Sequence, residues 1–273
     1  FSLIDNYEIN CSANRSGTLH CAHSQRGLKD IQLRFKQLSE RGAELELLDK
    51  QQTEQRIGSS KFFGSLFNKK AGIINPLDYC LGLAKAAESN GVNIYESTLA
   101  TKIQSINNDW LVKTPQGSIK AKMLLIATNA YQKPIEGLNP SKYTSVQYFQ
   151  VATKALPLDQ VRSVLPNGEG CWDTASVMSS FRLDTDNRLI IGGIGNLGHS
   201  GSKIHTNWAR RKVERLFPQL KNIAIEYSWH GRIAMTGDYI PKIIKLGNNA
   251  YSVFGYSGRG IGPGTYFGKA VSD

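Results

Sequence analysis

A glycine-rich stretch near the end of the sequence, "GYSGRGIGPGTYFGKA" (255–270), most constrains what this chain can fold into. Fourteen consecutive positions hold six glycines: Gly255, Gly258, Gly260, Gly262, Gly264 and Gly268. Because glycine costs backbone entropy, such a density indicates either φ > 0 or the close approach of another group. An extended run, "AYSVFG", precedes the loop, and a helical pattern follows it. This order is typical of an anion or cofactor site at a helix N-terminus, although tight packing alone stays open as an interpretation.

A second glycine motif, "GGIGNLG" (192–198), matches the G-x-G-x-x-G spacing through Gly193, Gly195 and Gly198. A dinucleotide site requires a helix to open within such a loop. Here polar residues intervene before any helical pattern, and the flanking runs resemble antiparallel strands. We therefore interpret this motif as a loop at the end of a strand.

The first half of the chain alternates helical and extended patterns. Residues 16–24 and 45–49 are predicted to be extended, and 27–43 and 50–58 to be helical. A further helix is predicted to begin at Pro76 with Asn75 as its N-cap and to end at Gly91. The run "VNIYE" after it is predicted to be a buried parallel strand, and Met123–Ala127 a strand covered on both faces.

From Tyr143 onward, long alternating runs predict a mostly antiparallel sheet, followed by a helix over 204–216 and a hairpin with "GNN" at its turn. The fold class predicted is therefore α/β (α+β). It combines a two-layer domain with a second domain that holds the antiparallel sheet.

The net charge of +11 is compatible with nucleic acid, an anionic membrane or an acidic substrate as partner. The basic residues are dispersed, and their densest cluster, Arg210–Arg215, is interpreted as a solvated helix face. No run of ~18 apolar residues predicts a membrane span. The four cysteines form no C-x-x-C pair and predict free thiols in a reducing, cytoplasmic setting. The scattered histidines predict no metal site.

Seven segments, taken in order, resemble the D-amino-acid oxidase/glycine oxidase superfamily of FAD-dependent oxidoreductases. They are "GTLHCAHS", "INPLDYCLGLAKAAESNGVNIYESTLATKI", "KMLLIATNAY", "FRLDTDNRLIIGG", "FPQL", "WHGRIAMTGDYIP" and "GYSGRGIGPGTYFGKA". Within the superfamily, the likeness is greatest to γ-glutamylputrescine oxidoreductase-like proteins.

The resemblance implies two domains. Residues 69–139 and 236–273 would form a discontinuous FAD-binding domain with an incomplete Rossmann-like fold, and residues 1–68 and 140–235 a substrate domain. The family's N-terminal βαβ unit, with its G-x-G-x-x-G loop, has no counterpart in the sequence. We therefore expect the chain as given to be a fragment that binds FAD poorly and is inactive by itself.

The activity implied is oxidation of an amine or amino-acid C–N bond by hydride transfer to FAD, giving an imine that hydrolyses. The substrate would be a small amine, such as a γ-glutamylputrescine-like compound. Two alternatives stay open: the flavin module of a tRNA wobble-uridine modification enzyme, which the positive charge favours, and a non-catalytic relic of the fold. The sequence does not indicate the electron acceptor or the oligomeric state.

The resemblance also implies the site residues. No side chain is expected to be catalytic, because the flavin carries the chemistry. Three residues are expected to contact the substrate: Arg182, Trp229 and Tyr256. The residues expected to contact the cofactor are Ala100, Ala127, Thr128, Asn129, Gly231, Gly258, Arg259, Gly260, Ile261 and Gly262.

One position departs from the pattern of glycine oxidase-like proteins. They carry a carboxylate-binding arginine four residues after the tryptophan of the "W-x-G" segment, where this chain has Ile233. The neighbouring Arg232 would point the other way on a strand. This departure favours an amine without a carboxylate beside the oxidised carbon.

Overall fold

The computed structural model describes residues 1–139, 141–198 and 201–272. The chain divides into two compact units. Unit 1 comprises Phe1–Asn93 and Tyr148–His230, and unit 2 comprises Ile94–Gln147 and Gly231–Asp273. This division assigns residues 69–93 to unit 1, whereas the predicted domains grouped them with the cofactor. The assignment of FAD-binding and substrate roles to domains stays a prediction.

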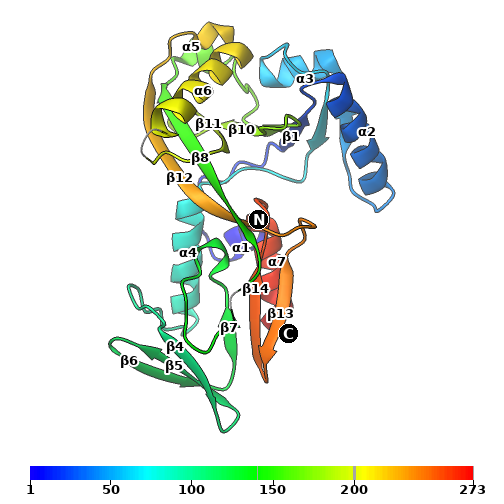
Figure 1. The fold of residues 1–273 in the computed structure, drawn as a ribbon. Helices are drawn as coiled ribbons and strands as arrows, with labels where there is room; N and C mark the ends of the chain where they lie inside the picture. The colour runs from blue at the N-terminus through cyan, green and yellow to red at the C-terminus, as the bar shows by residue number, and fades with distance from the viewer. Residues whose placement is uncertain (140, 199–200, 273) are drawn as a thin grey trace. The chain divides into compact units, whose positions relative to one another are not determined.

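Unit 1 is built on a sheet with the strand order β12-β8-β11-β10-β9-β1-β3-β2 (Figure 1). From β8 to β2, neighbouring strands are antiparallel, except that β1 and β9 are parallel. The prediction of a mostly antiparallel sheet is therefore confirmed, and the first strands of the chain also join it. The strands are β1 (Thr18–Cys21), β2 (Glu46–Leu48), β3 (Ser65–Asn68), β8 (Thr144–Ala155), β9 (Gly170–Asp173), β10 (Ser179–Leu183), β11 (Arg188–Ile194) and β12 (Ile225–Met235).

The helices of unit 1 begin where the sequence supplies caps. Asn75 accepts hydrogen bonds from the backbone N–H groups of Leu77 and Asp78, as the cap prediction required. Asp49 and Gln52 form a capping box at the start of α3. The helical elements are α1 (Ser2–Asn6), α2 (Gln25–Ser39), α3 (Lys50–Ile57), α4 (Pro76–Ser89), α5 (Leu158–Val161), α6 (Gly201–Leu216) and the 3-10 helix η2 (Pro218–Leu220).

The core of unit 1 lies between α6 and the sheet. The inner face of α6 buries Ala209, Val213 and Leu216 in the same cluster as Phe149 and Ile191 of the sheet. Burial of such side chains is worth roughly 1.5–3 kcal/mol each, so this layer holds the long strands β8 and β11 in place.

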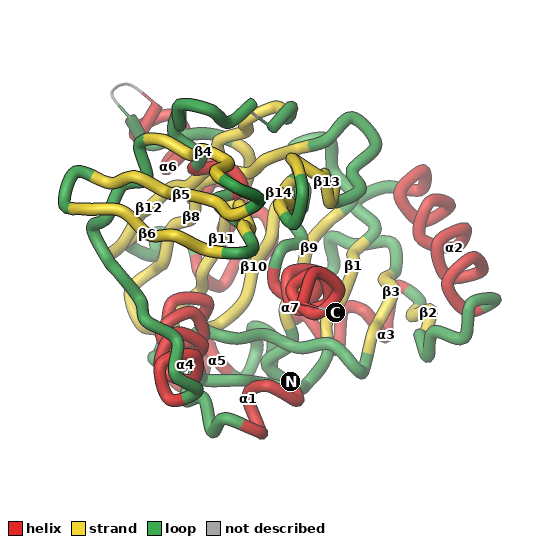
Figure 2. The backbone as a smooth tube through the Cα atoms, turned by 90° about the horizontal axis from the view of Figure 1, so that it is seen from below, coloured by secondary structure: helices red, strands yellow, loops and turns green. Residues whose placement is uncertain are grey.

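Unit 2 contains two three-stranded sheets and a helix (Figure 2). One sheet is the antiparallel meander β4-β5-β6. The other has the order β13-β14-β7, in which β14 and β7 are parallel and Ser252 is paired with Ile126. This pairing joins the two segments, within 69–139 and 236–273, that the resemblance placed in one discontinuous domain. The elements are β4 (Lys102–Ile106), β5 (Asp109–Thr114), β6 (Gly117–Ala121), β7 (Leu124–Ile126), the 3-10 helix η1 (Asn129–Tyr131), β13 (Lys242–Gly247), β14 (Ala250–Phe254) and α7 (Ile261–Ser272).

Two predictions about strands are wrong. Residues 92–96 form no strand, and Tyr95 is 63% exposed, because no strand in the described part of the chain pairs with them. The run Met123–Ala127 is not covered on both faces, since Met123 and Leu125 are 60% and 47% exposed while Ile126 is buried. A continuous apolar run indicates where a strand lies, whereas its burial depends on neighbours that the run does not specify. No helix among the described residues is long and apolar enough to cross a membrane.

Candidate functional site

Two loops and the end of strand β12 meet in unit 2 at the ends of the parallel strands β7 and β14. The Asn129 side-chain oxygen accepts a hydrogen bond from the backbone N–H of Gly255 at 3.0 Å. The Tyr131 hydroxyl oxygen accepts one from the backbone N–H of Arg232 at 2.9 Å. The backbone N–H of Ser257 donates to the carbonyl of Ala234 at 3.0 Å. Because carboxyl ends of parallel strands meet at one edge, such loops commonly build ligand sites.

The backbone of these loops contains several left-handed residues. Asn129 has φ 47° and Ser257 has φ 51°, while Gly255 and Gly258 have φ 83° and 85°. A Cβ on Gly255 would also lie 2.4 Å from Cγ2 of Thr236. Glycine at 255 is therefore required by the fold of the loop itself.

The next glycines are different. Gly260 has no left-handed φ, so of the two reasons for a glycine in this stretch only close approach of another group applies to it. A Cβ on Gly260 would meet only Tyr256, at an ordinary 3.8 Å, and one on Gly262 would meet nothing within 4 Å among the described residues. Packing within this chain does not demand glycine at either position. Their open backbone forms a cradle that side chains would fill, which fits a group that approaches from outside.

Most residues expected to contact the cofactor lie in this cluster of loops. Ala127, Thr128 and Asn129 follow β7, Gly231 lies in β12, and Gly258–Gly262 continue from β14 into α7. A Cβ on Gly231 would lie 2.9 Å from the Tyr131 hydroxyl, so this glycine also permits a close contact within the cluster. Ala100 lies two residues before β4, outside the contacts described above.

Sequence reasoning missed three residues that hold the cluster together: Tyr131, Thr236 and Ser257. The Ser257 hydroxyl lies 3.3 Å from the backbone nitrogen of Thr236, which donates to it. Tyr131 ends the segment "KMLLIATNAY" that supported the resemblance, so its place in the sequence was a usable signal. Nothing in the sequence indicated its backbone partner, which is 101 residues away.

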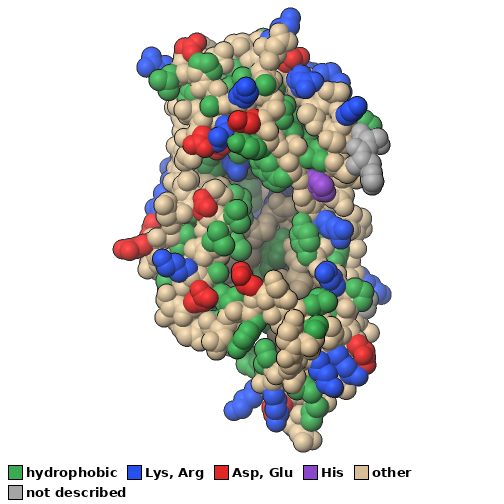
Figure 3. Space-filling view, turned by 90° about the vertical axis from the view of Figure 1, so that its left-hand side faces the viewer, with side chains coloured by type: hydrophobic (Ala, Val, Ile, Leu, Met, Phe, Trp, Pro, Cys, Tyr) green, Lys and Arg blue, Asp and Glu red, His purple; other side chains and the backbone are tan. Residues whose placement is uncertain are grey.

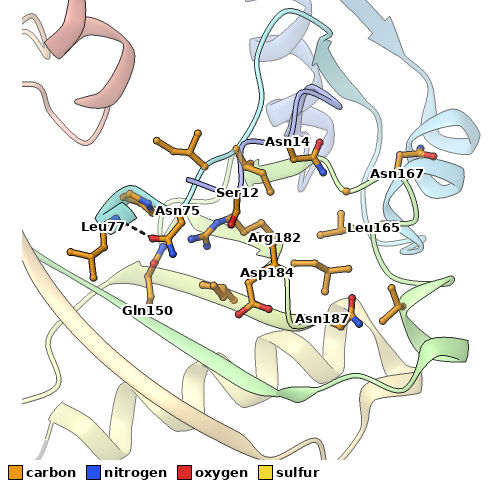
Figure 4. A pocket seen from close by; sticks show the side chains of 18 of the residues that line it. Ser12, Asn14, Asn75, Leu77, Gln150, Leu165, Asn167, Arg182, Asp184 and Asn187 are labelled. Carbon is orange, nitrogen blue, oxygen red and sulfur yellow. Dashed lines mark hydrogen bonds between the residues drawn. The ribbon is translucent and has the colours of Figure 1, made fainter. Parts of the chain in front are cut away.

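The substrate residues fall into both units. Arg182 of β10 and Trp229 of β12 line one cavity of about 820 Å³ in unit 1 (Figure 4). Trp229 is 43% exposed and so is not a core residue. Tyr256 belongs to the loop cluster of unit 2, where its ring packs edge-on against Phe267 of α7 with centroids 6.1 Å apart. The structure thus brings Arg182 and Trp229 together and places Tyr256 beside the glycine loop.

Two asparagine side chains, Asn14 and Asn75, line the unit 1 cavity, and the oxygen of each already accepts a hydrogen bond. The Asn75 side-chain oxygen caps α4, and the Asn14 side-chain oxygen accepts from the backbone N–H of Ser16 at 2.8 Å. The amide NH2 groups of both side chains form no hydrogen bond within the described residues. A cavity with free donors and occupied acceptors suits an anionic ligand.

Arg182 is the cation of this cavity, which the Asp184 carboxylate also lines. Its half-buried guanidinium forms no ion pair or side-chain hydrogen bond within the described part of the chain, and Figure 4 shows it extending toward Ser12 and Asn75. Burial lowers the pKa of Arg182, while the nearby Asp184 carboxylate acts in the opposite direction. Asp184 itself accepts hydrogen bonds from the backbone N–H groups of Asp186 and Arg188. A half-buried guanidinium without a direct ion pair is a strong binding group for a carboxylate.

Comparison with known proteins agrees with this geometry. The family model "FAD dependent oxidoreductase" (DAO) matches residues 2–273. A probable oxidoreductase OrdL from Haemophilus influenzae is 32% identical over 278 residues, covering 99% of this chain and 63% of the relative. Gamma-glutamylputrescine oxidoreductase from Escherichia coli is 30% identical over 260 residues, covering 94% of this chain and 61% of the relative. The chain thus spans less than two thirds of the length of these relatives.

Solved structures show the same fold. Glycine oxidase from Geobacillus kaustophilus superposes with a TM-score of 0.82 at 19% identity, covering 100% of this chain and 74% of that one. L-proline dehydrogenase from P. horikoshii gives a TM-score of 0.81 at 20% identity, covering 95% and 72%. The α/β fold class and the resemblance drawn from the seven segments are both confirmed. The chain therefore belongs to the DAO family of FAD-dependent oxidoreductases.

Proposed function

We propose that the protein oxidises the C–N bond of a small amine that carries a carboxylate remote from the oxidised carbon. The observation that carries this proposal is Arg182, a half-buried cation without a direct ion pair among the described residues, in a cavity with free amide donors. Membership of an FAD-dependent family supports the redox chemistry, and the relative named gamma-glutamylputrescine oxidoreductase supports a γ-glutamyl amine as substrate.

The loop cluster of unit 2 is suited to hold the flavin. The open backbone at Gly260 and Gly262 fits a flat group that needs close approach, and the backbone N–H groups of Ile261 and Gly262 lie in the first turn of α7. Free N–H groups at a helix start stabilise negative charge without reorganisation. When bound there, FAD supplies the hydride acceptor for the carbon next to the amine. The residues of the cluster bind and orient it through their backbone groups.

The position of Ile233 supports an amine without an adjacent carboxylate. Its Cδ1 atom lies 3.7 Å from where a Cβ on Gly258 would be, so an apolar group stands beside the glycine loop. Arg232 is exposed, as the alternation along β12 predicted, and its backbone N–H is engaged by Tyr131. Arg182 in unit 1 then remains the better candidate to bind the substrate carboxylate.

The proposal is tested with the full-length protein and two matched substrates, an N-γ-glutamyl diamine and the same diamine without the glutamyl group. We expect purified protein to release FAD on denaturation and to oxidise the glutamyl compound with the lower KM. Absence of flavin together with absence of amine oxidation would refute the proposal. Equal KM values for both compounds would retain the oxidase and reject the role of Arg182.

Two other functions were open. A tRNA-modifying flavin module would be favoured by a continuous basic surface, yet on the face shown in Figure 3 lysine and arginine side chains are interspersed with acidic and apolar ones. A non-catalytic relic would have no reason to keep an open glycine cradle. Binding of unmodified tRNA to the full-length protein at physiological salt would favour the first alternative.

We also propose a cytoplasmic location. The four cysteines are free thiols, and Cys11, Cys21 and Cys171 are buried. Burial raises the pKa of Cys171 well above its usual range, which makes it an inert thiol. Such unpaired cysteines are usual in reducing compartments, and mapping free thiols in protein from intact cells tests this.

A further inference from the structure

A second cavity, of about 890 Å³, lies wholly within unit 2 and shares no lining residue with the cavity of Arg182. It is lined by the meander, the β13–β14 hairpin and the segments around Tyr143 and Thr236. The proposed oxidation assigns it no role. From its lining we propose that this cavity is a binding site for a small aromatic carboxylate.

The charges of the cavity favour binding of an anion. Three lysines line it, Lys142, Lys242 and Lys245, against the single carboxylate of Asp238. Asp238 forms an ion pair with Lys242 and accepts a hydrogen bond from the backbone N–H of Ile240. Lys142 and Lys245 have no ion pair or side-chain hydrogen bond within the described residues. The lining therefore carries an excess of positive charge, and an ammonium–carboxylate hydrogen bond is about twice as strong as a neutral one.

The apolar wall of the cavity favours binding of a flat aromatic ring. Tyr143 and Phe254 lie with ring centroids 6.1 Å apart, and Trp110 provides a third ring. The Trp110 indole N–H donates to the carbonyl of Asn248 at 2.8 Å, which fixes the orientation of the ring. Gly247 makes this position possible, because a Cβ there would lie 2.9 Å from Cζ2 of Trp110. Fixed rings can stack with an aromatic ligand without loss of their own freedom.

Three hydroxyl groups of the lining already form hydrogen bonds with other groups of the chain. The Thr236 hydroxyl donates to the carbonyl of Ile240, and the Ser141 and Ser252 hydroxyls lie 3.2 Å apart and bond to each other. Asn139 and Thr144 also line the cavity with exposed polar side chains, and the other free groups of the lining are cationic or aromatic. An aromatic carboxylate combines the two features that match them.

The test uses the full-length protein, with 2-naphthoate as the probe and uncharged 2-naphthalenemethanol as its matched control, both measured by titration calorimetry. We expect naphthoate to bind at least about tenfold more tightly than the alcohol. Lys142→Gln and Lys245→Gln should each weaken naphthoate binding by about 5- to 10-fold and leave alcohol binding unchanged. Gly247→Ala should weaken both ligands, since it displaces Trp110.

Two control variants and the melting temperatures decide the outcome. Lys113→Gln on β5 removes an exposed positive charge outside the cavity and should leave naphthoate affinity unchanged, and so should Arg182→Leu in the other cavity. Melting temperatures within about 2 °C of wild type confirm that each lysine variant is folded. The proposal is overturned if naphthoate binds no better than the alcohol, if Lys113→Gln weakens it as much as Lys245→Gln, or if Arg182→Leu abolishes it.

Discussion

The Asn129 side-chain oxygen accepts a hydrogen bond from the backbone N–H of Gly255 at 3.0 Å and so joins two loops that are 126 residues apart in the sequence. Both loops follow strands of the same parallel pair, β7 and β14. Asn129 also adopts a left-handed φ of 47°, which asparagine and aspartate tolerate better than other residues with a Cβ. One side chain therefore fixes the edge of the sheet at which the flavin is proposed to bind.

Replacing Asn129 by alanine should lower the free energy of unfolding by about 1–3 kcal/mol, because the Gly255 N–H loses its partner and the backbone is strained. Asn129→Asp keeps both the acceptor and the left-handed preference, so it should lose less than half as much. Denaturant unfolding of the flavin-free, full-length protein measures both variants. Equal losses for alanine and aspartate would show that the hydrogen bond is not what matters.

Substitution of Gly255 should lower mainly the stability of the protein, whereas substitution of Gly260 should lower mainly its flavin content. Gly255→Ala introduces a Cβ 2.4 Å from Thr236 at a φ of 83° and should destabilise the flavin-free protein by about 1–3 kcal/mol. Gly260→Val places its side chain in open space and should cost less stability than Gly255→Ala, yet reduce flavin content strongly. The measurements are melting temperature and bound flavin per protein. Full flavin content in Gly260→Val would remove the cofactor role of this glycine.

Local sequence signals predicted much of the fold. Asn75 and Pro76 located the start of α4 because capping depends only on adjacent residues. The parallel contact between β7 and β14, in contrast, followed from the resemblance rather than from any local pattern. The strand expected at 92–96 is absent because a strand needs a partner, and periodicity alone cannot supply one.

The sequence was less informative about the cavities. Arg182 was identified from its segment, but its amide neighbours Asn14 and Asn75 come from distant parts of unit 1. Whether their oxygens are occupied, and hence whether the cavity attracts an anion, depends on hydrogen bonds to Ser16 and Leu77. These hydrogen bonds exist only in the folded chain. The cavity of unit 2 had no sequence signature, since its lysines are dispersed along the chain.

The ion pair at Asp238 predicts an acid-dependent loss of stability. The hydrogen bond from Lys242 is the main cause that lowers the pKa of Asp238 from 3.8 to about 2. A carboxyl whose folded pKa lies below its unfolded value stabilises the protein above the unfolded pKa, and this contribution disappears as pH falls from about 4 to about 2. NMR titration of the Asp238 carboxyl should give a midpoint of about 2.

Lys242→Gln serves as the matched test, because it removes the charged donor and keeps a side chain of similar length. The Asp238 midpoint should then rise toward 3.8. In Asp238→Asn, the fall in stability over this pH interval should be smaller than in the wild type. An unchanged midpoint in Lys242→Gln would assign the low pKa to the backbone N–H of Ile240 instead.

Arg182 should determine how well the protein binds a substrate carboxylate. Arg182→Leu removes the cation of the cavity and leaves the Asp184 carboxylate in its lining, so KM for an N-γ-glutamyl diamine should rise by about 10- to 150-fold, the range expected from losing a hydrogen bond to a charged group. The value of kcat should fall much less, because Arg182 is assigned to binding and not to the reacting bond. Arg182→Lys keeps the charge but loses the bidentate geometry, and its KM should lie between those of the wild type and Arg182→Leu.

Arg210→Leu, on the exposed face of α6, removes the same charge outside the cavity and should leave KM unchanged. With the diamine that lacks the glutamyl group, all these variants should have wild-type KM. A loss of the same size for both substrates would show that Arg182 supports the fold of the cavity and does not recognise the carboxylate.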